Sequence, residues 1–463
     1  MSLTSALNAA KSGLAATSTR AEITSRNIAN AETDGYVRKL GQAVTGLGGT
    51  VSIAKIDRQV DSMLNALDRA GISSMASASA RADGMAAYTD VLGQPNAEGS
   101  PAYYLGALQA SLVTLSADPS SRTAQNASVL AAKALTGNLH GLSGAIAEVQ
   151  SEVEASIKLD VADLNTALQT VAGLNRQISR SDTGAATADQ IDRLDRALDV
   201  IAGFMDVQIA RDARGNTTVH TAGGTELVIG DQAVPVRYDA VAGTLSAGGQ
   251  DITPGQVNRG FSEGSLAGLF DLRNNVLPGW SAELDTVAAG LIEASGRLAE
   301  LAPGSGLGLF TDAGLVYDDA NRKGLAARIQ VNAAVDPDLG GDAGLLQSGG
   351  DPTRPIGDLS LIAGLQSALR DKPQISGAGS ALGLSEYITS VVAGQHGQRA
   401  DAEAAQSRVA AAASTISASR SNIQSVDVDE ELQSLLAIQQ AYSANARIIS
   451  VVSGMLDDLI AAV

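Results

Sequence analysis

The stretch VDEELQSLLAIQQAYSANARIISVVSGMLDDLIAAV, residues 428–463, decides how the rest of the chain is interpreted. Its apolar residues recur at alternating steps of four and three, which predicts one long α-helix with an apolar stripe. Asp427 and the acidic residues after it supply an N-cap and match the helix dipole. Such a stripe requires a helical partner, because alone it would lie in water. The predicted seam consists of Val428, Leu432, Leu435, Gln439, Tyr442, Ala446, Ile449, Ser453, Leu456, Ile460 and Val463.

The beginning of the chain repeats the same steps. Asp34 and Gly35 then predict a helix end near residue 34 with a left-handed turn. Two seams at opposite ends of one chain can pair, so we expect the terminal segments to form a helical coiled coil. The N-terminal seam consists of Leu3, Leu7, Ala10, Leu14, Thr17, Ala21, Thr24, Ile28 and Ala31.

Composition limits the class of protein. The chain has 463 residues, 44% of them hydrophobic and only 3% aromatic, which favours long, thin helical packing over a thick enzyme core. A net charge of −18 argues against nucleic acid and anionic lipid as partners. The absence of cysteine excludes disulfides, thiol catalysis and thiolate metal sites. We find neither a cleavable secretory signal nor an apolar run of membrane-spanning length, so a cytoplasmic protein is expected unless export uses another signal.

Between the two terminal segments, the spacing of apolar residues changes from a helical to a strand period in one region. Helical spacing is predicted for residues 57–91, 103–115, 120–180, 189–205, 264–301 (with an interruption at Pro278 and Gly279) and 381–422. Between residues 207 and 238 the period becomes two, with turn residues between short runs, which indicates an antiparallel meander. Residues 303–373 are rich in Gly, Pro and Asp and predict loops with a few short elements.

The predicted fold is mainly α with an inserted β-rich domain: an elongated molecule in which the termini pair as a coiled coil, followed by a long-helix bundle and a small antiparallel β domain. Residues 1–60 and 423–463 are assigned to a discontinuous terminal assembly domain. The helix bundle is assigned residues 61–205, 262–302 and 375–422. A β-rich and loop-rich outer domain is assigned residues 206–261 and 303–374.

No constellation for chemistry is present in the sequence. The three histidines, His140, His220 and His396, have no second histidine at helical spacing, so no metal site is predicted. Glycines near residue 304 lack the strand and the Lys-Ser/Thr of a phosphate loop. Acidic pairs such as Asp318-Asp319 and Asp457-Asp458 are interpreted as solvated faces. We therefore expect no catalytic residues, no cofactor and no metal.

The sharpest local signal is NIANAETDGY, residues 27–36. Asn27 and Asn30 share one helix face, and Gly35 permits a left-handed turn that turns Tyr36 away from the helix. From spacing alone, an ordinary Asn-rich helix end explains these residues equally well.

These residues resemble a known family. Residues 14–38, ending NIANAETDGYVR, are similar to the N-terminal signature of bacterial flagellar rod, hook and hook-associated proteins. Residues 428–449 are similar to their C-terminal signature. Interior segments match the hook-associated members: DPSSR (118–122), LNRQIS (174–179), LDRAL (194–198) and GSLAGLFDLR (264–273). The resemblance covers most of the chain and favours a functional interpretation of residues 27–36.

The resemblance implies a structural adaptor that forms a ring at the junction of hook and filament. It implies export through the flagellar type III apparatus without signal cleavage, and an extracellular location in the flagellum. The implied partners are copies of the chain itself, the hook protein, a second hook-filament junction protein and a cytoplasmic export chaperone on the C-terminal helix, with no nucleic acid and no membrane insertion. The expected interface residues are Leu3, Leu7, Leu14, Asn27, Ile28, Asn30, Thr33, Gly35, Tyr36, Leu432, Leu435, Leu436, Tyr442, Arg447, Ile449, Val452, Leu456 and Ile460.

Three alternatives remain at this point. Another axial protein, hook or distal rod, would be mostly β outside its terminal helices, which the helical run 120–180 disfavours. A secreted peptidoglycan hydrolase with flagellar-type ends would need a cleft with paired carboxylates. A free-standing adhesin is the weakest alternative.

Overall fold

The structure is a computed structural model that describes residues 3–33, 35–95, 97–180, 185–212, 216–255, 259–301, 308–351, 353–370 and 383–461. The chain forms two compact units. Unit 1 comprises Met1–Ser77, Lys158–Ala267 and Ser407–Val463, and unit 2 comprises Ala78–Ile157 and Gly268–Gln406. The long helices α2 (Ser62–Leu92), α4 (Arg122–Arg180) and α10 (Leu384–Gln424) each contribute residues to both units.

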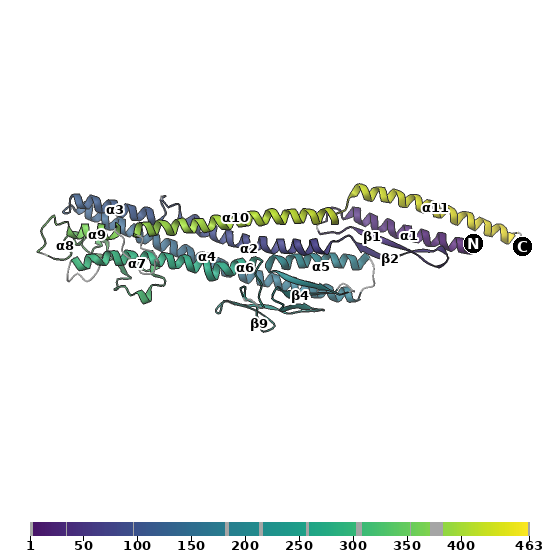
Figure 1. Ribbon diagram of the computed structural model, residues 1–463, viewed down its shortest axis with the longest axis horizontal. Coiled ribbons are helices and arrows are strands. Elements are labelled where there is room, and N and C mark those ends of the chain that lie inside the picture. Colours follow the sequence, from purple (N-terminus) through teal and green to yellow (C-terminus); the bar gives the residue numbers. More distant parts are fainter. Residues whose placement is uncertain are drawn as a thin grey trace. The chain divides into compact units, whose positions relative to one another are not determined.

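The two terminal helices of unit 1 lie side by side, as the sequence predicts. Helix α1 (Leu3–Ala29) packs against α11 (Val428–Ala461), and the two chain ends lie at the same end of this pair (Figure 1). An antiparallel hairpin, β1 (Lys39–Thr45) and β2 (Val51–Arg58), packs on α1. A short 3₁₀ turn, η1 (Leu47–Gly49), joins its strands.

The predicted helix ends are correct for α11 and wrong for α1. Oδ1 of Asp427 accepts hydrogen bonds from the backbone N–H of Asp429 (2.9 Å) and Glu430 (3.1 Å), so the predicted cap is confirmed. Helix α1 ends at Ala29 rather than near residue 34. The Asn30 N–H still donates to the Arg26 carbonyl at 3.1 Å, and the Asn30 side chain shares this acceptor at 2.8 Å. From Ala31 onward, turn hydrogen bonds to the third preceding residue replace the helical ones.

The remainder of unit 1 is a helical layer with a small β region. Helix α5 (Ala185–Phe204) lies beside the hairpin, and Leu194, Leu198 and Ile201 are fully buried. The predicted meander is confirmed as two antiparallel sheets, although strands β8 and β9 were not predicted. The sheets are β3 (Val207–Arg211), β4 (Thr217–Thr221), β5 (Glu226–Ile229) and β6 (Gln232–Ala233), and then β7 (Val236–Asp239), β8 (Thr244–Ala247) and β9 (Gln250–Asp251).

Unit 2 is built around α4, which runs for 59 residues without a break and confirms the predicted long helix. Trp280 and Tyr88 are fully buried in its core, with ring centroids 5.1 Å apart. The predicted interruption at Pro278 and Gly279 is wrong. A π-helical turn, η2 (Leu272–Val276), joins α6 (Ser265–Asp271) to α7 (Leu277–Leu301) without a break, and Pro278 comes two residues after this turn.

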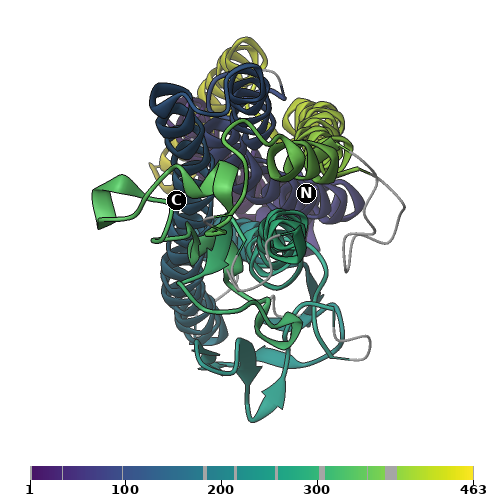
Figure 2. The same ribbon diagram turned by 90° about the vertical axis from the view of Figure 1, so that its left-hand side faces the viewer.

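Unit 2 also contains α3 (Pro101–Ala117), which is blue in Figure 2. The loop-rich part of unit 2 lies at the front of Figure 2, in green. Its short elements are β10 (Phe310–Asp312), η3 (Asp319–Asn321), η4 (Leu325–Ala327), β11 (Ile329–Val331), η5 (Pro337–Leu339), α8 (Leu345–Ser348) and α9 (Ser360–Arg370). The described residues of the predicted outer domain belong to different units, 206–255 and 259–261 to unit 1 and 308–370 to unit 2. The three-domain division stays a prediction.

Candidate assembly interface

Helices α1 and α11 pair in opposite directions. A Cβ atom on Gly13 would lie 3.0 Å from Oδ1 and Nδ2 of Asn445, so the helices approach closely at this level. Nε of Arg38, just before β1, lies 2.7 Å from Oε1 of Glu431 at the beginning of α11. The backbone N–H of Arg38 also donates to the Gln424 carbonyl at 2.9 Å. These contacts fix the register of the pair.

Only part of the predicted seam of α11 faces α1. On the side facing α1, Ile438 and Val452 are buried, and Leu435, Ile449 and Leu456 are half-buried. The other large interface candidates on this helix are exposed, although α1 is packed along it: Leu432, Leu436, Tyr442, Arg447 and Ile460. The physical reason is that the apolar stripe is wider than one helix can cover, so part of it faces solvent. On α1, the predicted residues Leu3, Leu7, Leu14 and Ile28 are half-buried.

Asn27 ties the end of α1 to the beginning of β1. Its side chain is buried, its Nδ2 donates to the Lys39 carbonyl at 2.9 Å, and its Oδ1 accepts from the Lys39 N–H at 3.2 Å. The Tyr36 hydroxyl donates to the same Oδ1 at 3.0 Å. Because Asn27 satisfies both backbone groups of Lys39, it replaces a missing strand neighbour. Asn30 has a local role: its Nδ2 donates to the Arg26 carbonyl, and its Oδ1 accepts from Thr33 at 3.4 Å.

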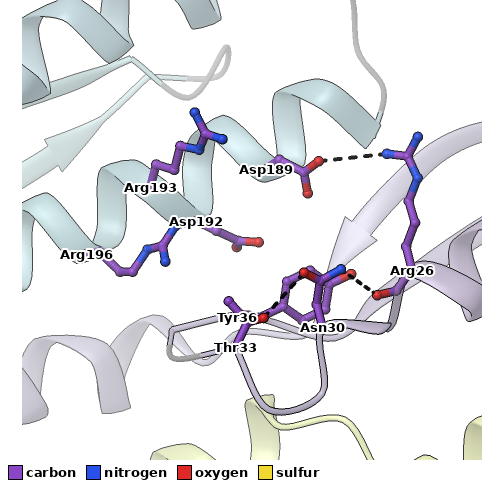
Figure 3. Close-up of a pocket in the computed structure, with 8 residues that line it drawn as sticks. All are labelled: Arg26, Asn30, Thr33, Tyr36, Asp189, Asp192, Arg193 and Arg196. Atoms are coloured by element: carbon purple, nitrogen blue, oxygen red, sulfur yellow. Dashed lines mark hydrogen bonds and ion pairs between the residues drawn. The ribbon is translucent and has the colours of Figure 1, made fainter. Parts of the chain in front are cut away.

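Tyr36, next to Gly35, lines a pocket of about 370 Å³. Gly35 has a φ of +68°, as its predicted left-handed turn requires. Figure 3 shows that the pocket is lined from one side by α1 and the turn after it, and from the other by α5. The α5 residues are Asp189, Asp192, Arg193 and Arg196. The Nζ of Lys39 lies 4.0 Å from the centre of the Tyr36 ring, and burial raises the pKa of the Tyr36 hydroxyl.

Helix α5 presents a row of carboxylates to the cations of five other elements, β1, β2, α2, β3 and α10. Lys39 on β1 pairs with Asp189 and with Asp192, at 2.8 Å from the latter. The other pairs are Arg58–Asp192 (2.7 Å), Arg58–Asp195 (2.6 Å), Arg69–Asp195 (3.0 Å), Arg69–Asp199 (2.7 Å), Arg211–Asp195 and Arg420–Asp199 (3.0 Å). We call Asp189, Asp192, Asp195 and Asp199 the acidic ladder.

Asp195 is the centre of the acidic ladder. Its side chain is 6% exposed and contacts arginines from β2, α2 and β3. Burial raises the pKa of this carboxyl, but Arg211, Arg58 and Arg69 outweigh burial and lower the pKa to about 2. The ladder therefore holds the hairpin, α2, α10 and the β region against one helix.

Sequence reasoning did not identify the ladder, although a signal was present. Its four aspartates recur at steps of three, three and four, which places them on one face of a helix. An acidic face on a helix is normally solvated, so the spacing predicts a shared face but does not predict burial.

The described residues include no group of His, Asp or Glu that could hold a metal ion. His140 and His396 contact the backbone carbonyls of Ile329 (2.6 Å) and Gly93 (2.8 Å), in agreement with structural histidines. Burial raises the pKa of Asp160 and of Glu283, which accept hydrogen bonds from Ser265 and Gln395. Within the described ranges no helix is long and apolar enough to cross a membrane.

Three family models match the chain. Residues 86–300 match the flagellar hook-associated protein FlgK helical domain. Residues 7–36 match the flagella basal body rod protein family, and residues 419–462 match the flagellar basal body rod FlgEFG protein C-terminal family. The two terminal matches coincide with α1 and α11, and the interior match contains the unbroken α4.

These matches support the predicted resemblance to flagellar hook-associated protein 1. Flagellar hook-associated protein 1 of Bacillus subtilis is 22% identical over 98% of this chain and 97% of its own length. The Salmonella typhimurium relative is 26% identical over 59% of this chain, and the Escherichia coli relative 24% over 63%. The chain spans about half the length of these two relatives, 53% and 56%. A solved flagellar hook junction protein FlgK from Burkholderia pseudomallei aligns with a TM-score of 0.46, 20% identity, 55% coverage of this chain and 48% of its own.

The predicted family and fold class are thus confirmed: a mainly helical flagellar structural protein with paired terminal helices and a small antiparallel β region. The rod-type models at both ends indicate assembly with other flagellar axial proteins.

Proposed function

We propose that this chain is a non-enzymatic adaptor that forms a ring between the hook and the filament. The observation that supports it best is the outer side of α11, where Ile448, Val451, Met455 and Leu459 are between 47% and 59% exposed. Large apolar side chains at successive helical turns are costly in water, so this surface fits a helix built for assembly. The interface expected from the sequence belongs to this proposal as well.

The proposed partners are copies of the chain, the hook protein and a second hook-filament junction protein. The proposed location is extracellular, after export through the flagellar type III apparatus without signal cleavage. Nucleic acid is not among the partners, because the net charge of −18 repels phosphate backbones.

A cytoplasmic export chaperone on α11 is the remaining proposed partner. A chain kept unfolded for export exposes the whole apolar stripe of α11, which is an association hazard. Truncating Leu436 to Ala, a 59% exposed residue, should weaken the complex by roughly 1 to 2 kcal/mol. Val241→Ala, at a 99% exposed position in the β region, is the control for calorimetric titration. Equal affinity for a chain that ends at Ser425 would place the chaperone site outside α11.

The alternatives are less well supported. A hook or distal rod protein would be mostly β outside its terminal helices, whereas α4 has 59 helical residues. A hydrolase would need two carboxyl groups within about 10 Å. Among the described residues, Asp160 and Glu283 are the carboxyl groups whose pKa burial raises, and each accepts a hydrogen bond from a neighbouring side chain, Ser265 or Gln395.

The test is to locate an epitope-tagged copy on isolated hook-filament complexes by immunogold labelling. A single band of label between hook and filament is expected, together with hooks that lack filaments when the gene is deleted. Label along the hook or on the rod would contradict the junction role. Muropeptide release from peptidoglycan by the purified chain would contradict the non-enzymatic role.

A further inference from the structure

The outer side of α11 carries one continuous row, which we call the outer row: Ile448, Val451, Met455 and Asp458. Its members are spaced by three or four residues, so they lie on one side of the helix. Their apolar members are 47%, 59% and 53% exposed, and Asp458 is exposed. Val452 and Leu456, next to them, face α1, so the outer row is continuous with the intrachain helix interface.

A groove of matching character lies on α1, along strand β2. It has a volume of about 460 Å³ and is lined mainly by small or apolar residues. Ser12 anchors its rim, because the Val51 N–H donates to the Ser12 Oγ at 3.0 Å. Ala15 is exposed in the groove, and Lys11, also exposed, lies one turn before it on α1. We call this the α1–β2 groove.

Within one chain, the outer row and the α1–β2 groove lie at different positions along the axis of the α1–α11 pair. Gly13 is opposite Asn445, and the helices are antiparallel, so Val451 lies level with residue 7 of α1. Ala15 is thus eight residues away, or about 12 Å along the axis. At the level of the groove, the same side of α11 instead exposes the smaller side chains of Ala437, Ala441 and Ala444, together with Gln440. Two copies at one level would therefore leave the large apolar side chains of the outer row outside the groove.

We propose that the α1–β2 groove of one copy receives the outer row of a neighbouring copy, with the two copies displaced by about 12 Å along the helix axis. The inference rests on the proposed ring function and specifies its contact. Because donor and acceptor surfaces differ, the contact is heterologous. With this displacement, repetition closes a ring where the paired helices are inclined to the ring axis, and it gives a helical turn where they are parallel to that axis.

Charge favours a second copy as the occupant. With Val451 opposite Ala15, Asp458 of the neighbour lies near residue 8 and within reach of Lys11. The small side chains Ser12, Ala15, Ala16 and Ala54 of the groove leave room for Val451 and for Met455, the longest apolar side chain of the outer row. Apolar and charged groups thus match in one register.

Cysteine cross-linking tests the contact directly, because the chain has no cysteine of its own. The variant pair Ala15→Cys with Val451→Cys should form disulfide-linked multimers in hook-filament complexes isolated under mild oxidation. Disulfides require Cα atoms within about 7 Å, so the readout is specific. The pair Ala15→Cys with Val428→Cys, on the same helices but far from the proposed register, should stay monomeric. Multimers from Ala15→Cys with Ser443→Cys would overturn the displacement.

A charge exchange gives an independent readout. Lys11→Glu and Asp458→Lys should each reduce filament number about threefold, and the double variant should restore it. Because both positions are exposed, the melting temperature of the purified chain should not change. Normal labelling at the junction with neither cross-link nor rescue would refute this contact and leave the proposed function intact. Absence of wild-type label at the junction would refute the proposed function.

Discussion

The Tyr36 hydroxyl donates a hydrogen bond of 3.0 Å to Oδ1 of Asn27 and so ties the turn after α1 back onto the helix. The same Asn27 side chain satisfies both backbone groups of Lys39, the first residue of β1. The motif of residues 27–36 is thus first a local folding device, which sets where the hairpin begins relative to the terminal helices. Its position beside α5 links that device to the acidic ladder.

Asn27→Ala should lower the free energy of unfolding by roughly 2 to 4 kcal/mol, because it leaves the buried backbone groups of Lys39 unpaired. Urea denaturation followed by circular dichroism measures this change. Asn30→Ala is the matched control, since it removes a local bond to the Arg26 carbonyl and a long contact to Thr33. Equal losses for the two variants would show that the Lys39 contacts contribute nothing specific.

Gly35→Ala should be destabilising for two separable reasons. A side chain at a φ of +68° costs roughly 1 kcal/mol, and the new Cβ atom would lie 2.7 Å from Cγ and Cδ of Arg196. Gly48→Ala, at a φ of +77° with no atom within 4 Å, reports the backbone cost alone. Gly35→Ala should lower the free energy of unfolding more than Gly48→Ala does, and this difference should disappear when Arg196 is also changed to Ala. If the difference persists, Arg196 is not its cause.

Asp195 should make stability depend on acid pH. Its pKa is lowered from 3.8 to about 2, so its contribution of roughly 2 kcal/mol is complete above about pH 4 and is lost as the pH falls toward 2. Asp195→Asn should cost roughly 3 to 5 kcal/mol at pH 7, because it leaves buried arginines unpaired, and should reduce the pH dependence between pH 4 and 2. Asp231→Asn, at an exposed pair with Arg176, is the control. Parallel stability–pH curves for wild type and Asp195→Asn would contradict the assignment.

Two helical glycines should respond to alanine in opposite directions. A Cβ atom on Gly84 of α2 would lie 2.3 Å from Cδ1 of Leu272, at the π-helical turn, so Gly84→Ala should cost roughly 1 to 3 kcal/mol. Gly106 of α3 has no atom within 4 Å of such a Cβ, so Gly106→Ala should stabilise by roughly 0.5 to 1 kcal/mol. The melting temperatures of both variants test this prediction. Stabilisation by both would show that the Leu272 side chain moves away from the new Cβ atom without a cost in stability.

Most elements could be predicted from local sequence. The apolar period gave α4 and α10 nearly to their ends, and the change of period at Val207 located the β region. The end of α1 could not be predicted, because the apolar period continues to Ala31 while the backbone changes to turn hydrogen bonds at that residue. The strands β8 and β9 were missed, because Thr244–Ala247 and Gln250–Asp251 are too short to show a period of two.

The candidate interface divides in the same way. The motif at Asn27 and Gly35 could be found from residue types and spacing, since a left-handed glycine after an asparagine-rich helix end is a local property. The ion pair between Arg58 and Asp195 could not be found in this way, because the two residues are 137 positions apart in the chain. The spacing of the aspartates along α5 would be the same whether their carboxylates were solvated or buried.

The sequence by itself determined that the two ends are long helices with apolar stripes, that they pair, and that the chain belongs with flagellar axial proteins. Only the tertiary structure decided which side of α11 faces α1. Leu432 and Leu435 both belong to the predicted seam, but only Leu435 is half-buried, on the side where Gly13 closely approaches Asn445. The acidic ladder likewise exists only after folding, because burial and three converging arginines set the pKa of Asp195, and none of these is a local property.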